Sequence, residues 1–572
     1  MENSQIADIF DKIADLIELQ GGNEFRVRSY QNAARTVRDL SQRLEDLVDQ
    51  GEDLSELPNI GDSTAEKIHE IIETGTCKRL EQQRKQVPSG VVELMQVPGL
   101  GARKAMAIHK GLGVTGMDEL EQACKDHKIR EIEGFGEKTE ESILKGIRTV
   151  QETAGRILWN AADDHVSALG RYIDGIDAIT RWEVAGSFRR RKETVGDLDI
   201  LILAEDRQAA TDALVEYEAV ADVVSRGEER VTVRLESGLQ IDFRYFEPAA
   251  FGAALMYFTG SKAHNVRLRR RAQEHDWKLN EYGLFKDDHR LAGKTEESVY
   301  SRLDLPWIAP ELREDRGEID AADADELPKL VAEKDIRGDL HAHTNASDGA
   351  NSIQEMARAA RERGHQFLAL TDHSKAVAVA GGLDEDALRK HAEAIHSVNE
   401  DLDDLWLLAG VEVDILKSGE LDLDENVLAD LDWVVASVHF NMEMSEKKMT
   451  DRIVAAIRSG VINAVGHPCG RLIGKRDPLQ FDIDAVLDAC KENDVCLEID
   501  AQPDRLDLPD VFCKQAAEAG VGISMGSDAH RIDGLEVLRL GVYVARRGWL
   551  EKSDVINTKT AKQLRKAIQS GK

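Results

Sequence analysis

The feature that most constrains this chain is a pair of aspartates placed directly before an apolar run. Asp197 and Asp199 stand two residues apart, and residues 200–203 (Ile-Leu-Ile-Leu) follow them. The run indicates a buried strand, on which residues i and i+2 point to the same side. Two carboxylates held together repel unless a cation lies between them, and hard oxygen ligands suit Mg²⁺ or Mn²⁺. The stretch therefore predicts a strand that carries a divalent-metal site.

Two further segments complete this predicted site. Gly186 and Ser187 begin eleven residues before Asp197 and offer main-chain N–H groups to a phosphate. Asp242 lies in a short alternating run that fits a neighbouring strand. Residues 231–235 are expected to pair with residues 240–245 across the turn at Ser237-Gly238, in a hairpin that carries Asp242 to the other two carboxylates. A bare Asp-x-Asp is more often an exposed turn, but the Gly-Ser pair and the third aspartate favour a site. Three carboxylates, two ions and a phosphate site describe two-metal nucleotidyl transfer with Asp197, Asp199 and Asp242 as catalytic residues.

At this point the sequence resembles the DNA polymerase X family, the polymerase beta-like nucleotidyltransferases. The resemblance continues into residues 257–265 (YFTGSKAHN), which are similar to the family's YFTGS motif. It implies that Arg190 contacts the triphosphate, that two aromatic residues lie beside the sugar, and that an asparagine reaches the base. Lys262 stands where polymerase beta has Asp, so contacts at the base are expected to differ. The implied nucleotide-binding residues are Gly186, Ser187, Arg190, Tyr257, Phe258, Gly260 and Asn265.

Three segments near the N-terminus share one pattern: an apolar residue, a tight turn, a glycine and then a helix. They lie at residues 57–61, 97–101 and 132–136. This pattern resembles the helix-hairpin-helix motif, whose turn offers N–H groups to a DNA phosphate without reading sequence. A plain helical hairpin explains one copy equally well, but three copies favour DNA binding. The implied DNA-binding residues are Gly61, Gly99, Gly101, Gly134 and Gly136.

The segment 25–72 also resembles the small N-terminal lyase domain of the same family. Lys67 falls where that family places a Schiff-base lysine, and Tyr30 falls where it places a tyrosine. Ser63, however, stands where polymerase beta has a lysine. Because a lysine on a helix is usually a solvated surface residue, lyase chemistry and a surface role both remain open for Lys67.

The second half of the chain, residues 336–572, alternates apolar strand-like runs with helical patterns. His341 and His343 stand at i and i+2 after a short run, so both imidazoles point the same way. Further histidines and acidic residues follow the later runs. This is the layout of a (β/α) barrel with ligands at the carboxyl ends of its strands. Imidazole and carboxylate together favour Zn²⁺, Mn²⁺ or Fe²⁺.

This half resembles the PHP (polymerase and histidinol phosphatase) domain. The resemblance implies a centre of up to three Zn²⁺ or Mn²⁺ ions that activates water for attack on a phosphoester. Some members have His where Asp348 stands, which keeps a ligand. All the positions hold competent ligands, so we expect an active domain. The implied metal ligands are His341, His343, Asp348, His373, Glu412, His439, His467, Asp528 and His530.

Composition limits the classes of function and the cellular locations that the chain can have. A net charge of −33 argues against a protein that coats DNA nonspecifically, although residues 189–192 and 267–271 are locally basic. No apolar stretch is long enough to span a bilayer, and the N-terminus lacks a secretory pattern, so we expect a cytoplasmic protein. The six cysteines form no CxxC pair and are expected to be reduced.

We therefore expect a multidomain α+β and α/β protein: a DNA polymerase that fills short gaps during base excision repair, using Mg²⁺ or Mn²⁺. Its PHP domain is expected to be a 3′–5′ exonuclease, or a phosphoesterase that processes 3′ ends or abasic sites. The expected partners are gapped or nicked DNA and dNTPs, bound by a monomer. The alternatives are a small-molecule phosphatase with a regulatory N-terminal half, and a DNA-binding scaffold with a silent polymerase half.

The expected domains are a helical lyase-like domain with the first helix-hairpin-helix (1–80), a helix-hairpin-helix DNA-binding domain (81–150), a nucleotidyltransferase palm (151–248), a nucleotide-closing subdomain (249–318), an acidic linker (319–335) and the PHP domain (336–572).

Overall fold

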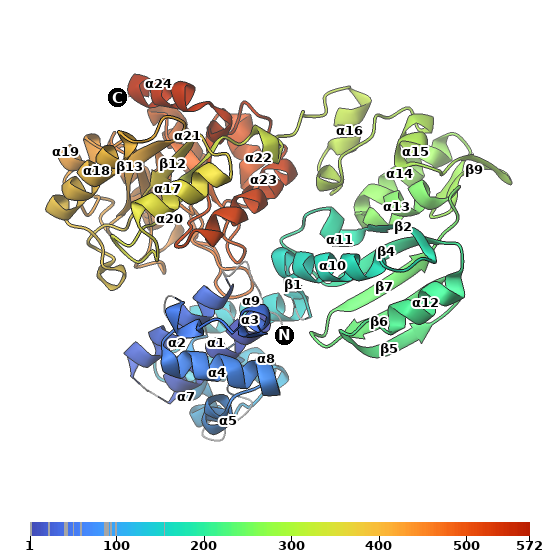
Figure 1. Cartoon of the computed structure of the whole chain (residues 1–572), viewed down its shortest axis with the longest axis horizontal. Coiled ribbons are helices and arrows are strands. Elements are labelled where there is room, and N and C mark those ends of the chain that lie inside the picture. The colour runs from blue at the N-terminus through green and yellow to red at the C-terminus, as the bar shows by residue number, and fades with distance from the viewer. Residues whose placement is uncertain are drawn as a thin grey trace.

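The computed structural model describes residues 3–20, 23–38, 44–49, 51–57, 60–84, 91, 94–95, 97, 100–153 and 155–571. Figure 1 shows a helical N-terminal part in blue, a mixed sheet with its helices in green, and a C-terminal α/β part from yellow to red. This arrangement confirms the expected fold class. None of the helices in these ranges is long and apolar enough to cross a membrane. All six cysteines are buried and unpaired.

The N-terminal part is a set of short helices around one apolar core. Helix α1 buries Ile6, Phe10, Ile13 and Ile17, which recur at helical spacing, and α1 packs along α2. Glycines in the left-handed region end α4 at Gly75 and α7 at Gly113. The helices are α1 Asn3–Leu19, α2 Glu24–Arg38, α3 Leu44–Asp49, α4 Asp62–Thr74, α5 Lys78–Arg84, α7 Ala102–Leu112, α8 Met117–Lys125 and α9 Glu137–Thr153.

The next part is a five-stranded sheet, here called the palm sheet, with the order β2-β4-β7-β6-β5. The predicted hairpin is confirmed: β6 and β7 pair antiparallel, and β7 runs parallel to β4. Asp199 on β4 is the register partner of Asp242 on β7. The elements are β1 Ile157–Leu158, α10 Trp159–Ile173, β2 Ile179–Val184, α11 Gly186–Arg189, β3 Thr194–Val195, β4 Asp197–Ala204, α12 Arg207–Val215, β5 Val220–Arg226, β6 Arg230–Leu235 and β7 Gln240–Tyr245.

Residues 249–335 form a smaller unit with a core of its own, which includes Met256, Leu268 and Tyr300. The stretch 319–335, expected to be an acidic linker, is packed at its start, because Ile319 and Ala322 of α16 are buried. Two arginines of the basic run 267–271 pair with its aspartates, at 2.6 Å to Asp320 and 2.7 Å to Asp323. The elements are α13 Phe251–Thr259, α14 Lys262–Glu274, β8 Lys278–Asn280, β9 Gly283–Lys286, β10 His289–Ala292, α15 Glu296–Arg302 and α16 Glu318–Asp323.

The C-terminal part is a parallel sheet of seven strands in sequential order, β11 to β17. A parallel bridge between Ala342 and Ala529 joins the two ends, so the sheet is a nearly closed barrel. Its strands are β11 Gly338–Ala342, β12 Phe367–Leu370, β13 Trp406–Asp414, β14 Trp433–Ser437, β15 Ala464–Val465, β16 Cys496–Asp500 and β17 Ile523–Gly526. Its helices are α17 Ile353–Glu362, α18 Glu385–Asn399, α19 Glu425–Ala429, α20 Glu446–Ile457, α21 Ile483–Asn493, α22 Asp510–Ala519, α23 Leu538–Arg547 and α24 Ala561–Gly571.

Ion pairs join the barrel to both earlier parts. Towards the palm sheet, Arg539 lies 2.9 Å from Asp163 and Arg471 lies 2.6 Å from Glu193. Towards the N-terminal helices, Lys475 lies 4.0 Å from Asp11. The barrel is therefore in contact with both halves of the region expected to handle DNA.

Candidate active sites

The palm sheet brings two of its predicted metal ligands together on adjacent strands. Parallel pairing of β4 and β7 sets Asp199 beside Asp242, and Asp197 stands at the start of β4. Asp242 is fixed by Thr232 of β6, whose hydroxyl donates to it at 2.7 Å. The sequence correctly predicted that this hairpin would carry Asp242 to the Asp-x-Asp strand.

Arg244, which was not predicted from the sequence, forms ion pairs with both Asp199 and Asp242. Its Nε is 3.1 Å from Asp199 Oδ1, and its Nη2 is 2.7 Å from Asp242 Oδ2. Arg244 stands two residues after Asp242 on β7, so strand periodicity was a signal that could have found it. Burial raises the pKa of Asp199 to about 6; Arg244 opposes this shift and Asp197 adds to it. The carboxylates fit Mg²⁺ or Mn²⁺ in donor type, and binding an ion between them requires Arg244 to move away.

The predicted nucleotide-binding residues lie around α11 and α13. Gly186, with a φ of 64°, starts α11, and a Cβ there would lie 3.2 Å from Asp199 Oδ2. Ser187, the next residue of that helix, is half-buried. Arg190 bonds to the main-chain oxygen of Thr259 and lies 3.0 Å from Glu314, so its guanidinium is engaged within the protein.

The aromatic pair at the end of α13 lies next to the carboxylates. The rings of Tyr257 and Phe258 are 5.2 Å apart, and the Arg244 guanidinium is 4.4 Å from the Phe258 ring. Asn265 donates to the main-chain oxygen of Tyr257 at 2.7 Å, and Gly260 ends the helix. The structure thus gathers the residues of the YFTGS-like motif around the Asp-x-Asp strand.

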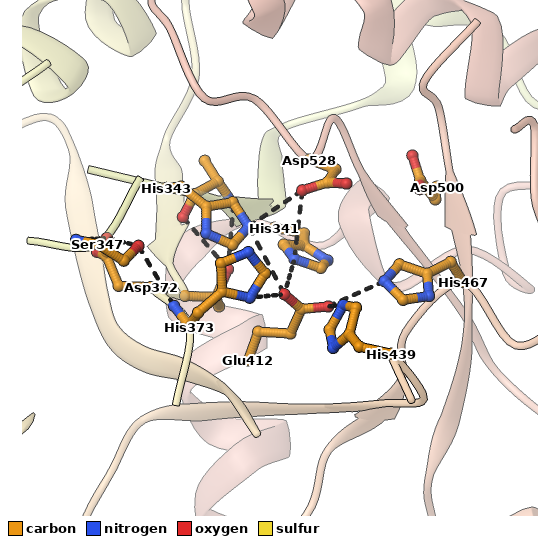
Figure 2. A network of polar contacts seen from close by, with 12 residues as sticks. His341, His343, Ser347, Asp372, His373, Glu412, His439, His467, Asp500 and Asp528 are labelled. Carbon is orange, nitrogen blue, oxygen red and sulfur yellow. Dashed lines mark hydrogen bonds and ion pairs between the residues drawn. The ribbon is translucent and has the colours of Figure 1, made fainter. Parts of the chain in front are cut away.

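The barrel gathers all nine predicted ligands at the carboxyl ends of its strands. Glu412 of β13 is at the middle (Figure 2), with His373 at 2.7 Å and His467 at 2.9 Å from its oxygens. On the other side, His343 lies 3.0 Å from Asp528, and His530 lies 3.3 Å from Asp348. Three sets have ligand atoms within 4.8 Å of one another: His343, Asp348, His373 and His530; His341, His343 and Asp528; and His373, Glu412 and His439.

The polar atoms of this cluster fit a metal centre. His341 Nε2 and His343 Nδ1 are buried without a hydrogen-bond partner, which is costly unless an ion satisfies them. Burial and neighbouring imidazoles lower the pKa of His343 to about 4, which favours the neutral form that binds metals. Burial alone would raise the pKa of Glu412, but the surrounding imidazoles hold it well below its ordinary value.

Two carboxylates behind the cluster were missed from the sequence. His341 Nδ1 donates to Glu498 at 2.7 Å, and His439 Nδ1 donates to Asp414 at 3.0 Å. Such contacts fix the tautomer and orientation of a metal-binding imidazole. Glu498 and Asp414 are acidic residues inside buried strands, β16 and β13, and that placement was the available signal.

By contrast, the palm aspartates are not among the sets with mutually close ligand atoms within the described part of the chain. The two sites therefore differ in how close their ligand atoms lie. Those of the barrel cluster are already close together, whereas Arg244 lies between the palm carboxylates.

The predicted DNA-binding glycines have open surroundings. Gly61 and Gly101 precede α4 and α7, and Gly136 accepts the first hydrogen bonds of α9. A Cβ at any of these, or at Gly134, would meet nothing within 4 Å, so another backbone can approach closely. Gly99 lies outside the described residues.

Lys67 and Tyr30 lie together, as the lyase resemblance implies. Lys67 Nζ is 5.9 Å from the centre of the Tyr30 ring and donates to Ser63 at 2.7 Å. Burial is the largest cause that lowers the pKa of Lys67, which favours the nucleophilic free amine.

Models of five known families match successive parts of this chain. They are a helix-hairpin-helix domain (residues 1–77), a SAM-like helix-hairpin-helix tandem (91–149), the DNA polymerase beta palm (156–246), the DNA polymerase beta thumb (254–314) and the PHP domain (339–502).

Individual relatives agree with these matches. A Bacillus subtilis (strain 168) protein, "DNA polymerase/3'-5' exonuclease PolX", is 35% identical over 569 residues, which is 99% of each chain. DNA polymerase lambda of Arabidopsis thaliana is 25% identical over 354 residues, 54% of this chain and 62% of that protein. A probable phosphatase of Thermoanaerobacter sp. (strain X514) is 30% identical but covers only 39% of this chain and 91% of its own length.

Proposed function

Since the chain belongs to the family X DNA polymerases that carry a C-terminal PHP domain, we propose that it extends a DNA 3′ end at one site and hydrolyses 3′ ends at another. The extending site is built on Asp197, Asp199 and Asp242. The hydrolysing site is the barrel cluster around Glu412. The observation that carries this proposal is the presence, in one chain, of an Asp-x-Asp palm strand and an assembled cluster of eight close ligand residues with His467 beside Glu412.

At the palm sheet, the protein holds the metal-binding carboxylates in position. Two divalent ions there would activate the primer 3′ hydroxyl and neutralise the triphosphate. Thr232 fixes Asp242, and the absent side chain at Gly186 leaves room beside Asp199. Arg244 must release both carboxylates. The neighbouring ring of Phe258 can then hold its guanidinium by a cation–π contact. We expect Arg190 to exchange Glu314 for the triphosphate.

At the barrel, ions held by the cluster would supply hydroxide at neutral pH and clamp a phosphate. Glu498 and Asp414 orient His341 and His439. The neutral state of His343 keeps its nitrogens available for binding. We propose Zn²⁺ or Mn²⁺, up to three ions, because the donors are mixed imidazole and carboxylate.

We further propose that the substrate is gapped or nicked DNA with dNTPs, that the two sites cooperate in base excision repair, and that the protein acts as a monomer. Open glycine turns ahead of three helices support contact with DNA backbone. A silent scaffold would not need the paired carboxylates, and a small-metabolite phosphatase would not need a palm sheet.

The test uses a 5′-labelled primer in a gapped duplex, incubated with Mg²⁺ or Mn²⁺ and analysed on a denaturing gel. With dNTPs the primer should lengthen by the size of the gap, and without them it should shorten from its 3′ end. A chelator should stop both reactions. Absence of extension would support the scaffold. Turnover of a phosphorylated amino alcohol in preference to the gapped duplex would support the phosphatase.

A further inference from the structure

The barrel cluster opens into a large cleft that it shares with the N-terminal helices. This cleft has a volume of about 2370 Å³. Its lining includes His373, Glu412 and His530 of the cluster, Arg171 of α10, and a row of residues from α2. Helix α2 and the hydrolytic centre therefore line the same cleft, although the two are separated by more than 300 residues of sequence.

The face that α2 presents to the cleft is polar and regular. Arg28, Gln31, Asn32 and Arg35 all line the cleft and are all exposed. They stand at i, i+3, i+4 and i+7, which is one stripe of a helix. The other face of the helix, Val27, Ala33, Ala34 and Val37, is buried in the N-terminal core. The fold thus requires the apolar face for packing and leaves this stripe, here called the α2 stripe, directed at the cleft.

The charges of the cleft suit a polyanion. Its described lining holds ten Lys and Arg against eleven Asp and Glu, and three of those acids are the predicted ligands Asp348, Glu412 and Asp528. The whole chain, by contrast, has 74 basic and 107 acidic residues. Neither Arg28 nor Arg35 pairs with a carboxylate among the described residues. The cleft is therefore close to neutral, and less acidic than the chain as a whole, with two arginines available for an anion.

We propose that the α2 stripe is the second wall of the hydrolytic site and binds the sugar-phosphate backbone of the strand whose 3′ end is cut. This inference rests on the proposed hydrolysis at the barrel cluster. Seven residues of helix rise about 10 Å, so Arg28 and Arg35 contact different phosphates of one strand. No Phe, Tyr or Trp is among the described residues that line the cleft, so the strand is held by its backbone and not by base stacking.

The experiment compares the full-length protein with the double variant Arg28→Ala/Arg35→Ala on a 5′-labelled single-stranded oligonucleotide. We expect KM to rise at least tenfold while kcat stays within about twofold. The slope of log affinity against log salt should become shallower by about 1.4, since each lost phosphate contact on a single strand removes about 0.7. Arg28→Lys/Arg35→Lys should restore most of the slope, because charge and not side-chain shape carries a backbone contact.

Arg358→Ala is the control, because Arg358 is an exposed arginine of α17 that does not line the cleft. It should leave KM and the salt slope unchanged. Thermal melting of each variant checks that the helix still packs. An unchanged KM and slope in the folded double variant, or an equal effect of Arg358→Ala, would overturn the inference. If His341→Ala still shortened the oligonucleotide, the proposed function itself would fail, which is a distinct result.

Discussion

Arg547 Nη1 donates a hydrogen bond of 2.7 Å to the main-chain oxygen of Arg190. The same guanidinium lies 3.1 Å from Glu314, which itself pairs with Arg190 at 3.0 Å. Arg547 belongs to α23 of the barrel and is almost fully buried. A side chain of the hydrolytic half therefore holds the residue expected to bind the triphosphate in the polymerising half.

Arg547→Ala should weaken nucleotide binding. The lost hydrogen bonds to a charged group correspond to about 1.5–3 kcal/mol, so we expect KM for dNTP in primer extension to rise about tenfold or more. Shortening of a single-stranded oligonucleotide should change little. Arg546→Ala, the adjacent arginine of α23 that pairs with Glu311 at 2.7 Å, is the control. An unchanged KM in a folded Arg547→Ala protein would show that the contact is only structural.

Primer extension should lose affinity for Mg²⁺ in mild acid. Burial raises the pKa of Asp199 from 3.8 to about 6, so below pH 6 a proton increasingly occupies the carboxylate and competes with the ion. The Mg²⁺ concentration for half-maximal extension should be constant from pH 7 to 8 and rise towards tenfold per pH unit below 6. Reading half-saturation at each pH separates binding from the pH dependence of the chemical step. A constant value down to pH 5 would contradict the raised pKa.

Glu498→Gln should weaken metal binding without removing a ligand. Glu498 holds His341 Nδ1 at 2.7 Å and accepts from the main-chain N–H of His467 at 2.8 Å. Loss of such a carboxylate lowers metal affinity about 10–100-fold. The Mn²⁺ needed for 3′ shortening should rise by that factor, and excess Mn²⁺ should restore the rate. Glu492→Gln, on α21 away from the cluster, is the control; failure of Mn²⁺ to rescue would point to misfolding.

Lys67 should form a covalent adduct with abasic DNA if the lyase resemblance holds. Burial lowers the pKa of Lys67, and Tyr30 lies beside it. Borohydride added to the protein and an incised abasic duplex should trap a cross-link, which Lys67→Ala should abolish. Lys78→Ala changes a highly exposed lysine of α5 and should trap normally. Equal trapping by both variants would leave Lys67 as a surface residue.

The sequence predicted the parts of the fold that depend on local pattern. The alternation in β6 and β7 and the apolar run after Asp199 predicted which strands meet, and the histidines at strand ends predicted the barrel cluster. Arg547 and the α2 stripe could not be predicted, because they act across contacts between distant parts of the chain. The acidic composition of residues 319–335 suggested a loose linker. Its start is instead paired, because Arg267 and Arg271 contact Asp320 and Asp323. These arginines lie 53 and 52 residues upstream, so the sequence near the aspartates gave no sign of the pairing.

The most direct test of two separate centres is a pair of single-turnover assays on one gapped, 5′-labelled DNA with Asp199→Ala and His341→Ala. We expect that Asp199→Ala abolishes extension and keeps 3′ shortening, whereas His341→Ala abolishes shortening and keeps extension. Loss of both activities in each folded variant would contradict it.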